Sequence, residues 1–295
     1  NRPMIIHAAH VNLAPLAKAT ANLIGATTIL NIYGLEAWSR ISRSRKGAIR
    51  TVDCVIADCH FTSNYVAEHQ MRVSRPLVLW DCVDLDRFSP GICRSNVLKH
   101  YGIPSSGEPF IIMTLGRLSK AQYKGFERLL RVFAEIAPSC PKARLVIAGS
   151  GEQGEHLVRV ARDLHIDGKT CFTGSIDERH LPDVYRAASI FSLISERGEG
   201  RGEGLPLTPL EALAGGIPII VGNQDGSQEA VIEGHNGIVC DPFDLAGQAK
   251  TLLDLYEKPT LLESMRQQAR QSALERFGYD QFRNQLEEIY RGLGY

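Results

Sequence analysis

The sequence predicts an α/β protein built on two parallel β-sheets, each covered by helices on both faces. Short apolar, β-branched runs alternate with amphipathic helical stretches along the chain, which is the pattern of strand-helix-strand units. This alternation is interrupted once, near residue 90, and the 295 residues are enough for two hydrophobic cores. We therefore expect two Rossmann-like, doubly wound domains, of which the first is incomplete.

The first series of elements runs from residue 4 to residue 80. We predict strands at 4–7, 27–32, 53–57 and 77–80, and helices at 13–24, 37–50 and 61–71. Asp, Pro and Gly residues then break the pattern over 81–91. Four strands without a glycine-rich opening turn amount to about half of a doubly wound domain. We assign residues 1–90 to this partial first domain.

The second series is complete. Its predicted strands are 110–115, 143–148, 169–172, 190–194, 217–221 and 237–240, and its predicted helices are 95–101, 124–137, 154–164, 180–187, 208–214, 245–256 and 260–277. Six parallel strands make a full doubly wound domain, which we assign to residues 91–275. A last helix, at 279–292, lies in a C-terminal segment of residues 276–295 that we expect to pack back toward the first domain.

Composition excludes several classes of protein. The 33 basic residues equal the 33 acidic residues in number, so no global positive field would attract nucleic acid. Seven scattered cysteines favour buried thiols in a reducing compartment. No apolar run reaches the roughly 18 to 20 residues that cross a bilayer, and no signal-peptide segment opens the sequence. We expect a cytoplasmic protein.

Two cations follow the first strand of the second series. Open parallel sheets bind ligands beyond the carboxyl ends of their strands, and there Gly116 and Arg117 follow strand 110–115 while Lys124 opens the next predicted helix. The arginine fork and the lysine point charge suit a pyrophosphate, especially one that gains charge as a leaving group. The alternative is that Lys124 is a solvated lysine at a helix start, where it would oppose the helix dipole.

The next strand ends in a glycine turn. Gly149 and Gly151 flank Ser150 directly after strand 143–148. Missing side chains would let a ligand approach the backbone at this point. Turn geometry alone is the alternative explanation.

A glycine-rich, charged segment over 195–206 is the most informative feature. Glu203 in this loop and Glu211 on the following helix stand eight residues apart. The helix is expected to start at about Thr208, next to Leu207, and its free N–H groups would attract an anion. Carboxylates accept pairs of hydroxyls, so Glu203 suits a sugar and Glu211 suits a ribose. The alternative is a solvated surface loop.

At these residues the sequence resembles the retaining GT-B glycosyltransferases of family four. The residues that carry the resemblance are Gly116-Arg117-Leu118 with Lys124-Gly125, Gly149-Ser150-Gly151, the pair Glu203 and Glu211, Glu229-Ala230-Val231 and, in the first series, Ile6-His7-Ala8-Ala9-His10, Asn31-Ile32-Tyr33-Gly34-Leu35-Glu36 and Val83-Asp84-Leu85-Asp86-Arg87-Phe88.

The resemblance implies a GT-B fold and transfer of a hexosyl group from a nucleotide diphosphate sugar to a hydroxyl acceptor, with retention of anomeric configuration. It implies no cofactor, no catalytic nucleophile and no metal, since cations neutralise the diphosphate and the leaving phosphate assists the incoming hydroxyl. The site residues that it implies are catalytic Arg117, Lys124 and Glu203, donor-binding Gly116, Gly149, Gly151, Leu207, Thr208 and Glu211, and Tyr33 and His10 on the acceptor or sugar side.

Three features depart from the family pattern. Tyr33 stands where the family often has histidine, and the loop before Glu211 lacks the usual aromatic. An alignment on Gly-Leu-Pro would put Arg201 in the place of the first glutamate, but only Glu203 keeps the eight-residue step. The opening units of the first domain, roughly 80 to 90 residues at about 30 per unit, are expected to be missing, as in a truncated product or fragment.

Other interpretations stay open at this point. One is a catalytically incomplete fragment that binds a nucleotide sugar. Another is a nucleotide-dependent oxidoreductase, although no G-x-G-x-x-G opens a helix. The pair His7 and His10 is expected to be packed or to line a substrate site rather than to bind a metal. A basic run over 40–50 (Arg40, Arg43, Arg45, Lys46 and Arg50) indicates either a solvated helix face or weak contact with a membrane surface.

Overall fold

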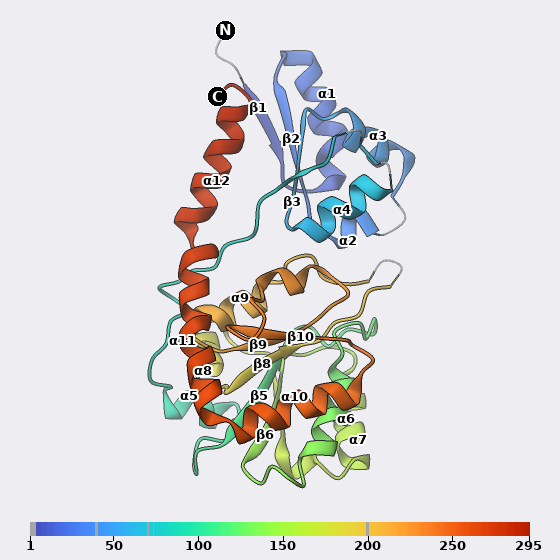
Figure 1. The fold of residues 1–295 in the computed structure, drawn as a ribbon. Helices are drawn as coiled ribbons and strands as arrows, with labels where there is room; N and C mark the ends of the chain where they lie inside the picture. The colour runs from blue at the N-terminus through green and yellow to red at the C-terminus, as the bar shows by residue number, and fades with distance from the viewer. Residues whose placement is uncertain (1–3, 39–40, 70, 73, 199–200) are drawn as a thin grey trace.

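The computed structural model describes residues 4–38, 41–69, 71–72, 74–198 and 201–295. They form two α/β domains, one above the other in Figure 1, joined by an extended segment and by the C-terminal helices. One sheet has four strands and the other has six, and every described strand pair is parallel. The predicted α/β class with two parallel sheets is therefore confirmed.

The first domain is built on the four-stranded sheet in the order β1-β2-β3-β4. Its strands are β1 (Ile5–Ala8), β2 (Thr27–Ile32), β3 (Cys54–Ala57) and β4 (Leu77–Val78), and its helices are α1 (Ala14–Ile24), α2 (Leu35–Trp38), α3 (Arg43–Thr51) and α4 (His60–Glu68). All four residues of β3 are buried, as expected for a strand covered on both faces.

Two predictions in this domain were wrong. The helix expected at 37–50 is two helices, because α2 ends at Trp38 and Ser42 starts α3 by accepting a hydrogen bond from the Arg45 N–H. The strand expected at 77–80 has two residues, and Trp80 instead packs its ring on Phe277. Arg40 of the basic run lies outside the described residues.

The second domain is built on the six-stranded sheet in the order β10-β9-β8-β5-β6-β7. Its strands are β5 (Phe110–Leu115), β6 (Ala143–Ala148), β7 (Thr170–Gly174), β8 (Ile190–Leu193), β9 (Ile219–Gly222) and β10 (Gly237–Cys240). From β5 the chain builds one half of the sheet through β6 and β7, then crosses to β8 and builds the other half. The switch point of a doubly wound sheet therefore lies between β5 and β8, where ligands bind.

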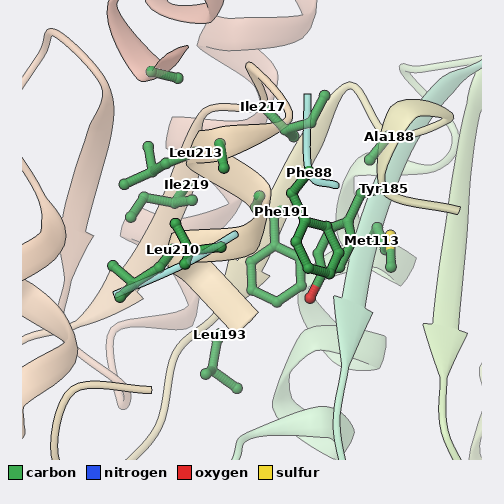
Figure 2. Close-up of a cluster of buried hydrophobic side chains, with 14 of the residues drawn as sticks. Phe88, Met113, Tyr185, Ala188, Phe191, Leu193, Leu210, Leu213, Ile217 and Ile219 are labelled. Atoms are coloured by element: carbon green, nitrogen blue, oxygen red, sulfur yellow. The ribbon is translucent and has the colours of Figure 1, made fainter. Parts of the chain in front are cut away.

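Helices cover both faces of this sheet. They are α5 (Ser95–His100), α6 (Phe126–Ile136), α7 (Gly154–Asp163), α8 (Leu181–Arg186), α9 (Leu207–Ala214), α10 (Leu245–Glu257) and α11 (Pro259–Arg276). Figure 2 shows how Leu210 and Leu213 of α9 lie beside Phe191 and Ile219 in one apolar cluster. This packing fixes the start of α9 at the carboxyl edge of the sheet.

The last helix, α12 (Tyr279–Gly292), crosses from the second domain to the first and runs along the first sheet (Figure 1). Its residues Phe282, Leu286 and Ile289 pack against a buried cluster that includes Ile29 and Ile56. Beyond the helix, the Tyr295 hydroxyl donates to the Met4 carbonyl at 3.0 Å and contacts the Thr27 hydroxyl at 2.7 Å. The C-terminal segment thereby completes the core of the first domain. None of the helices in the described ranges is long and apolar enough to cross a membrane.

Candidate active site

A cavity of about 800 Å³ opens beyond the carboxyl ends of β5 and β6. Its lining includes Arg117, predicted as catalytic, and Gly116, Gly149 and Gly151, predicted as donor-binding. Gly149 has φ +121°, and a Cβ there would stand 2.1 Å from the Gly116 carbonyl oxygen; Gly151 has φ +151° and equally little room. Only glycine fits these two positions, so backbone forms this wall of the cavity.

Lys124 lies beside this cavity, but it does not open a helix as predicted. Gly125 adopts a left-handed conformation with φ +76°, and α6 begins only at Phe126. The aliphatic part of Lys124 passes Gly116, where a Cβ would meet its Cδ at 3.2 Å. Its ammonium forms an ion pair with Glu203 in which both side chains are mostly buried. Lys124 and Glu203, which are 79 positions apart and were both predicted as site residues, therefore contact each other.

Arg117 occupies a different environment. Its side chain is 76% exposed, and its guanidinium forms an ion pair with Glu152 at 3.4 Å. Arg117 lines the cavity and is not part of the buried ion pair of Lys124 and Glu203. The two predicted cations therefore flank Gly116, one buried and one in solvent.

The loop that carries Glu203 is fixed by a buried carboxylate that the sequence analysis did not single out. Asp225 accepts hydrogen bonds from the Glu203 N–H at 3.1 Å and from the Ser195 hydroxyl at 2.5 Å. Burial raises the pKa of Asp225 to about 6, against the opposing effect of its serine hydrogen bonds. Arg201 is exposed and its guanidinium donates to the Ala121 carbonyl, so Glu203 and not Arg201 lies against Lys124. Glu199 and Gly200 fall outside the described residues.

Helix α9 starts at Leu207, one residue before the predicted start. Pro206 is its N-cap, and no side chain caps its first N–H groups. Leu207 is exposed and Thr208 is partly exposed, so these groups remain open to an anion. One turn later, Glu211 accepts a hydrogen bond from the Tyr185 hydroxyl at 2.6 Å. Burial raises the pKa of Glu211, and the Tyr185 hydrogen bond opposes that rise.

The carboxyl edge of the first sheet carries the two residues predicted for the acceptor or sugar side. His10 Nε2 lies 3.0 Å from a carboxylate oxygen of Glu36. The Tyr33 hydroxyl accepts a hydrogen bond from the Asn31 amide at 3.3 Å. Burial raises the pKa of both Tyr33 and Glu36. In the ranges that the structure describes, no three His, Cys, Asp or Glu side chains are grouped so that they could hold a metal ion.

Two carboxylates join the first domain to the second. Asp58, directly after β3, accepts the Leu205 N–H at 3.0 Å. Glu229 accepts the N–H groups of His60 and Phe61, at 2.9 and 2.7 Å, and the indole N–H of Trp80 at 2.9 Å. Asp58 follows a strand, so the rule that located Arg117 could have found it. The contact of Glu229 with α4 spans 168 residues and has no local signal.

Comparison with known proteins identifies the family. Residues 100–272 match the glycosyl transferases group 1 family. The GDP-mannose-dependent alpha-(1-6)-phosphatidylinositol monomannoside mannosyltransferase of Mycolicibacterium smegmatis is 30% identical over 289 residues, which cover 95% of this chain and 73% of the relative. Glycogen synthase of Mycobacterium tuberculosis is 27% identical over 300 residues, covering 98% of this chain and 69% of that protein.

Solved structures share the architecture. HepE of Anabaena in complex with UDP superposes with a TM-score of 0.85 at 17% identity, covering 98% of this chain and 79% of that one. Sucrose-phosphate synthase of Thermosynechococcus elongatus gives 0.79 at 20% identity, covering 98% and 73%. The predicted GT-B fold is confirmed, and the oxidoreductase interpretation is excluded. The chain belongs to the glycosyl transferases group 1 family.

Proposed function

We propose that this glycosyltransferase transfers a hexosyl group from a nucleotide diphosphate sugar to a hydroxyl acceptor, with retention of anomeric configuration and without a metal ion. The observation that carries the proposal is the ion pair of Lys124 with Glu203, beside the glycine-lined cavity. The lysine supplies a cation for the diphosphate, and the glutamate beside it supplies a carboxylate that can accept hydrogen bonds from the sugar hydroxyls.

The cavity would hold the nucleotide. Its glycine wall allows the ligand to lie against the backbone at Gly149 and Gly151. Burial is the main cause of the raised pKa of Glu211, and the charge of Glu178 raises it further. Glu178 lines the cavity, so Glu211 lies near the cavity as well. A glutamate in this position suits the two hydroxyls of a ribose.

The diphosphate would lie between Lys124, Arg117 and the open start of α9. The lysine ammonium is a compact charge, the arginine fork can bind two oxygens, and the helix start adds about half a positive charge. Glu203 would accept hydroxyls of the transferred sugar. The ammonium of Lys124 would then contact both Glu203 and the phosphate. Its charge would stabilise the diphosphate most in the transition state, when negative charge builds up on the leaving phosphate.

The chemical step needs no protein nucleophile. The bond from the anomeric carbon to the diphosphate oxygen breaks, and the acceptor oxygen bonds to the same carbon on the same face. The acceptor proton passes to the leaving phosphate oxygen. The acceptor would lie along the edge with Tyr33 and His10, where Asp58 already connects the two domains.

Two isosteric variants test the proposal. GDP-mannose, which a relative is named for, and UDP-glucose, bound in a solved neighbour, are the first donors to titrate by calorimetry. Glu203→Gln should weaken sugar-nucleotide binding and slow transfer while leaving GDP or UDP affinity nearly unchanged. Glu211→Gln should weaken both ligands by about 10-fold, the value of a charged hydrogen bond. The exposed Glu155→Gln on α7 is the matched control.

Unchanged affinity for nucleotide and sugar nucleotide in both variants would contradict these roles. Donor binding by the wild type with no transfer to any sugar or polyol would favour a protein that binds nucleotide sugars without turnover. A thermal-shift screen of UDP, GDP, ADP and TDP sugars identifies the nucleotide first, because a ligand of the folded state raises its stability.

A further inference from the structure

A second cavity, of about 620 Å³, lies between the two domains. The first domain contributes Trp38, Phe61 and Tyr65 to its lining, and the second contributes Arg197 and Gln224 together with Gly198. Its walls are therefore aromatic on one side and hydrogen-bonding on the other. Neither the nucleotide cavity nor the pair of Lys124 and Glu203 includes any of these residues.

Arg197 is held in this cavity by aromatic faces. Its guanidinium carbon lies 4.8 Å from the ring centroid of Tyr65, 5.1 Å from that of Phe61 and 5.7 Å from that of Trp38. Among the described residues no carboxylate lies within 4.0 Å of the guanidinium and no acceptor bonds to it. A cation–π contact uses none of the guanidinium N–H donors, so they stay available for hydrogen bonds. The rings thus contact a cation that has no carboxylate partner among the described residues.

The other polar groups of the lining are also available as donors. Gln224 uses its carbonyl oxygen to accept the Arg197 backbone N–H at 3.3 Å, and its amide NH₂ has no partner among the residues that the structure describes. The Tyr65 hydroxyl has no partner in the described ranges. No carboxylate occurs in the described lining. Such a cavity complements an oxyanion carried on a ring or an apolar body.

The cavity adjoins the proposed sugar-transfer site. A Cβ built on Gly202 would stand 2.9 Å from the Trp38 ring, and Glu203 is the next residue along the chain. The same Cβ would stand 3.7 Å from the Arg197 Cα, so the residue before Glu203 contacts two residues that line the cavity. The cavity and the proposed sugar-transfer site are therefore neighbours, and one acceptor could reach both.

We propose that this cavity is an acceptor subsite that binds a carboxylate or phosphate of the acceptor through Arg197, with the acceptor ring against Trp38 and Phe61. The inference rests on the proposed function and extends it by naming the acceptor class, an anionic sugar or polyol. Arg197 is a specificity residue in this scheme and takes no part in donor binding.

Three aryl probes of matched body test the subsite by calorimetry with GDP or UDP present. They are 4-nitrophenyl β-D-glucuronide, 4-nitrophenyl β-D-glucoside and the 6-phosphate of that glucoside. The wild type should bind the glucuronide or the phosphate at least about 10-fold more tightly than the neutral glucoside, which is the value of one charge-assisted contact. Preference for the glucuronide identifies a carboxylate acceptor, and preference for the phosphate identifies a phosphorylated one.

Variants link the preference to Arg197. Arg197→Gln should abolish it while leaving nucleotide affinity unchanged, and Arg197→Lys, which keeps the charge and loses the fork, should retain part of it. Arg283→Gln, an exposed arginine on α12, should keep the full preference. Equal affinities of the wild type for all three probes, or a preference that survives Arg197→Gln, would overturn the subsite. Failure of the wild type to bind any nucleotide would instead contradict the proposed function.

Discussion

The carboxyl edges of the two sheets meet between the domains, but they carry different side chains. On the six-stranded sheet the edge has cations, Arg117 and Lys124, and each forms an ion pair with a glutamate. On the four-stranded sheet the edge has carboxylates, the buried Asp58 and the half-buried Asp81, and the charge of Asp58 acts on Asp81. The hydrogen bond from Leu205 to Asp58 brings these edges together.

The two edges differ in how easily their charged groups ionise. Lys124 lies against a carboxylate, so its charge is balanced even where it is buried. Asp81 has no cationic partner within the described ranges, and burial together with the charge of Asp58 raises its pKa to about 6. Under the proposed function, one edge stabilises the charge of a leaving diphosphate while the other accepts hydrogen bonds from hydroxyls. The contrast thus holds for particular groups: the two donor-side cations are each paired with a glutamate, whereas the pKa of Asp81 is raised by burial and by a second carboxylate.

The largest effect should come from removing the buried cation. Lys124→Ala should lower kcat/KM by about 100- to 1000-fold, as expected when a preorganised group that stabilises developing charge is lost. Arg117→Ala should cost about 30-fold, because its exposed charge is screened by water. Steady-state kinetics of donor consumption measures both.

Loss of the lysine also leaves Glu203 buried without its partner, so stability needs a control. The double variant Lys124→Ala with Glu203→Gln should recover thermal stability and remain inactive. Near-normal turnover in Lys124→Ala, or equal losses for the two cations, would remove the distinction between the buried and the exposed charge.

A smaller effect, on stability, tests the other edge. Asp81 has a folded pKa of about 6, against an ordinary value of 3.8. Between these values the folded chain holds the proton and the unfolded chain does not, so the wild type loses stability as pH rises from 4 to 6. Asp81→Asn cannot ionise. Its free energy of unfolding, relative to wild type, should rise over this interval by up to about 3 kcal/mol and stay constant above it.

Denaturant unfolding at a series of pH values from 4 to 8 gives this difference directly. Asp163→Asn, an exposed aspartate at the end of α7, is the matched control and should show no such trend. A difference between Asp81→Asn and wild type that does not vary with pH would mean that Asp81 is not held in an unfavourable environment.

Local patterns predicted most of the fold. The six strands of the second domain occur where apolar runs were found, and the strand order follows from the connection rules of doubly wound sheets. The prediction of one helix over 37–50 failed because helical composition hid a boundary at Ser42, a residue type that commonly starts helices. Lys124 was misplaced for a related reason, since Gly125 adopts a left-handed conformation that composition does not reveal.

Half of the candidate site could be predicted in the same way. Glu203, Glu211 and the glycine turns follow strands or open a helix, so position in the chain located them. Asp225 follows β9 and caps the next turn through the Ser227 N–H, so the strand-end rule could have found it. Arg197 was missed because its environment is made by distant segments. Arg197 contacts rings from the first domain, more than 100 positions earlier in the sequence. Side chains whose effect depends on such contacts have no signature in a local pattern.

The smallest expected effect concerns metal ions. If the donor edge itself supplies the positive charge, EDTA should leave the transfer rate unchanged within about a factor of two. Lys124, Arg117 and the open start of α9 are the positive groups that this edge would present to a diphosphate, and the two cations would then turn from their glutamate partners toward the phosphates. In enzymes that use a divalent ion, that ion supplies the same neutralisation, so the two arrangements replace one another.

The assay compares the wild type with Lys124→Ala, each with EDTA, Mg²⁺ or Mn²⁺. Loss of wild-type transfer in EDTA, restored by either metal, would show that the cationic edge alone does not neutralise the diphosphate. Partial rescue of Lys124→Ala by Mg²⁺, with no effect on the wild type, would support the substitution of a lysine for an ion.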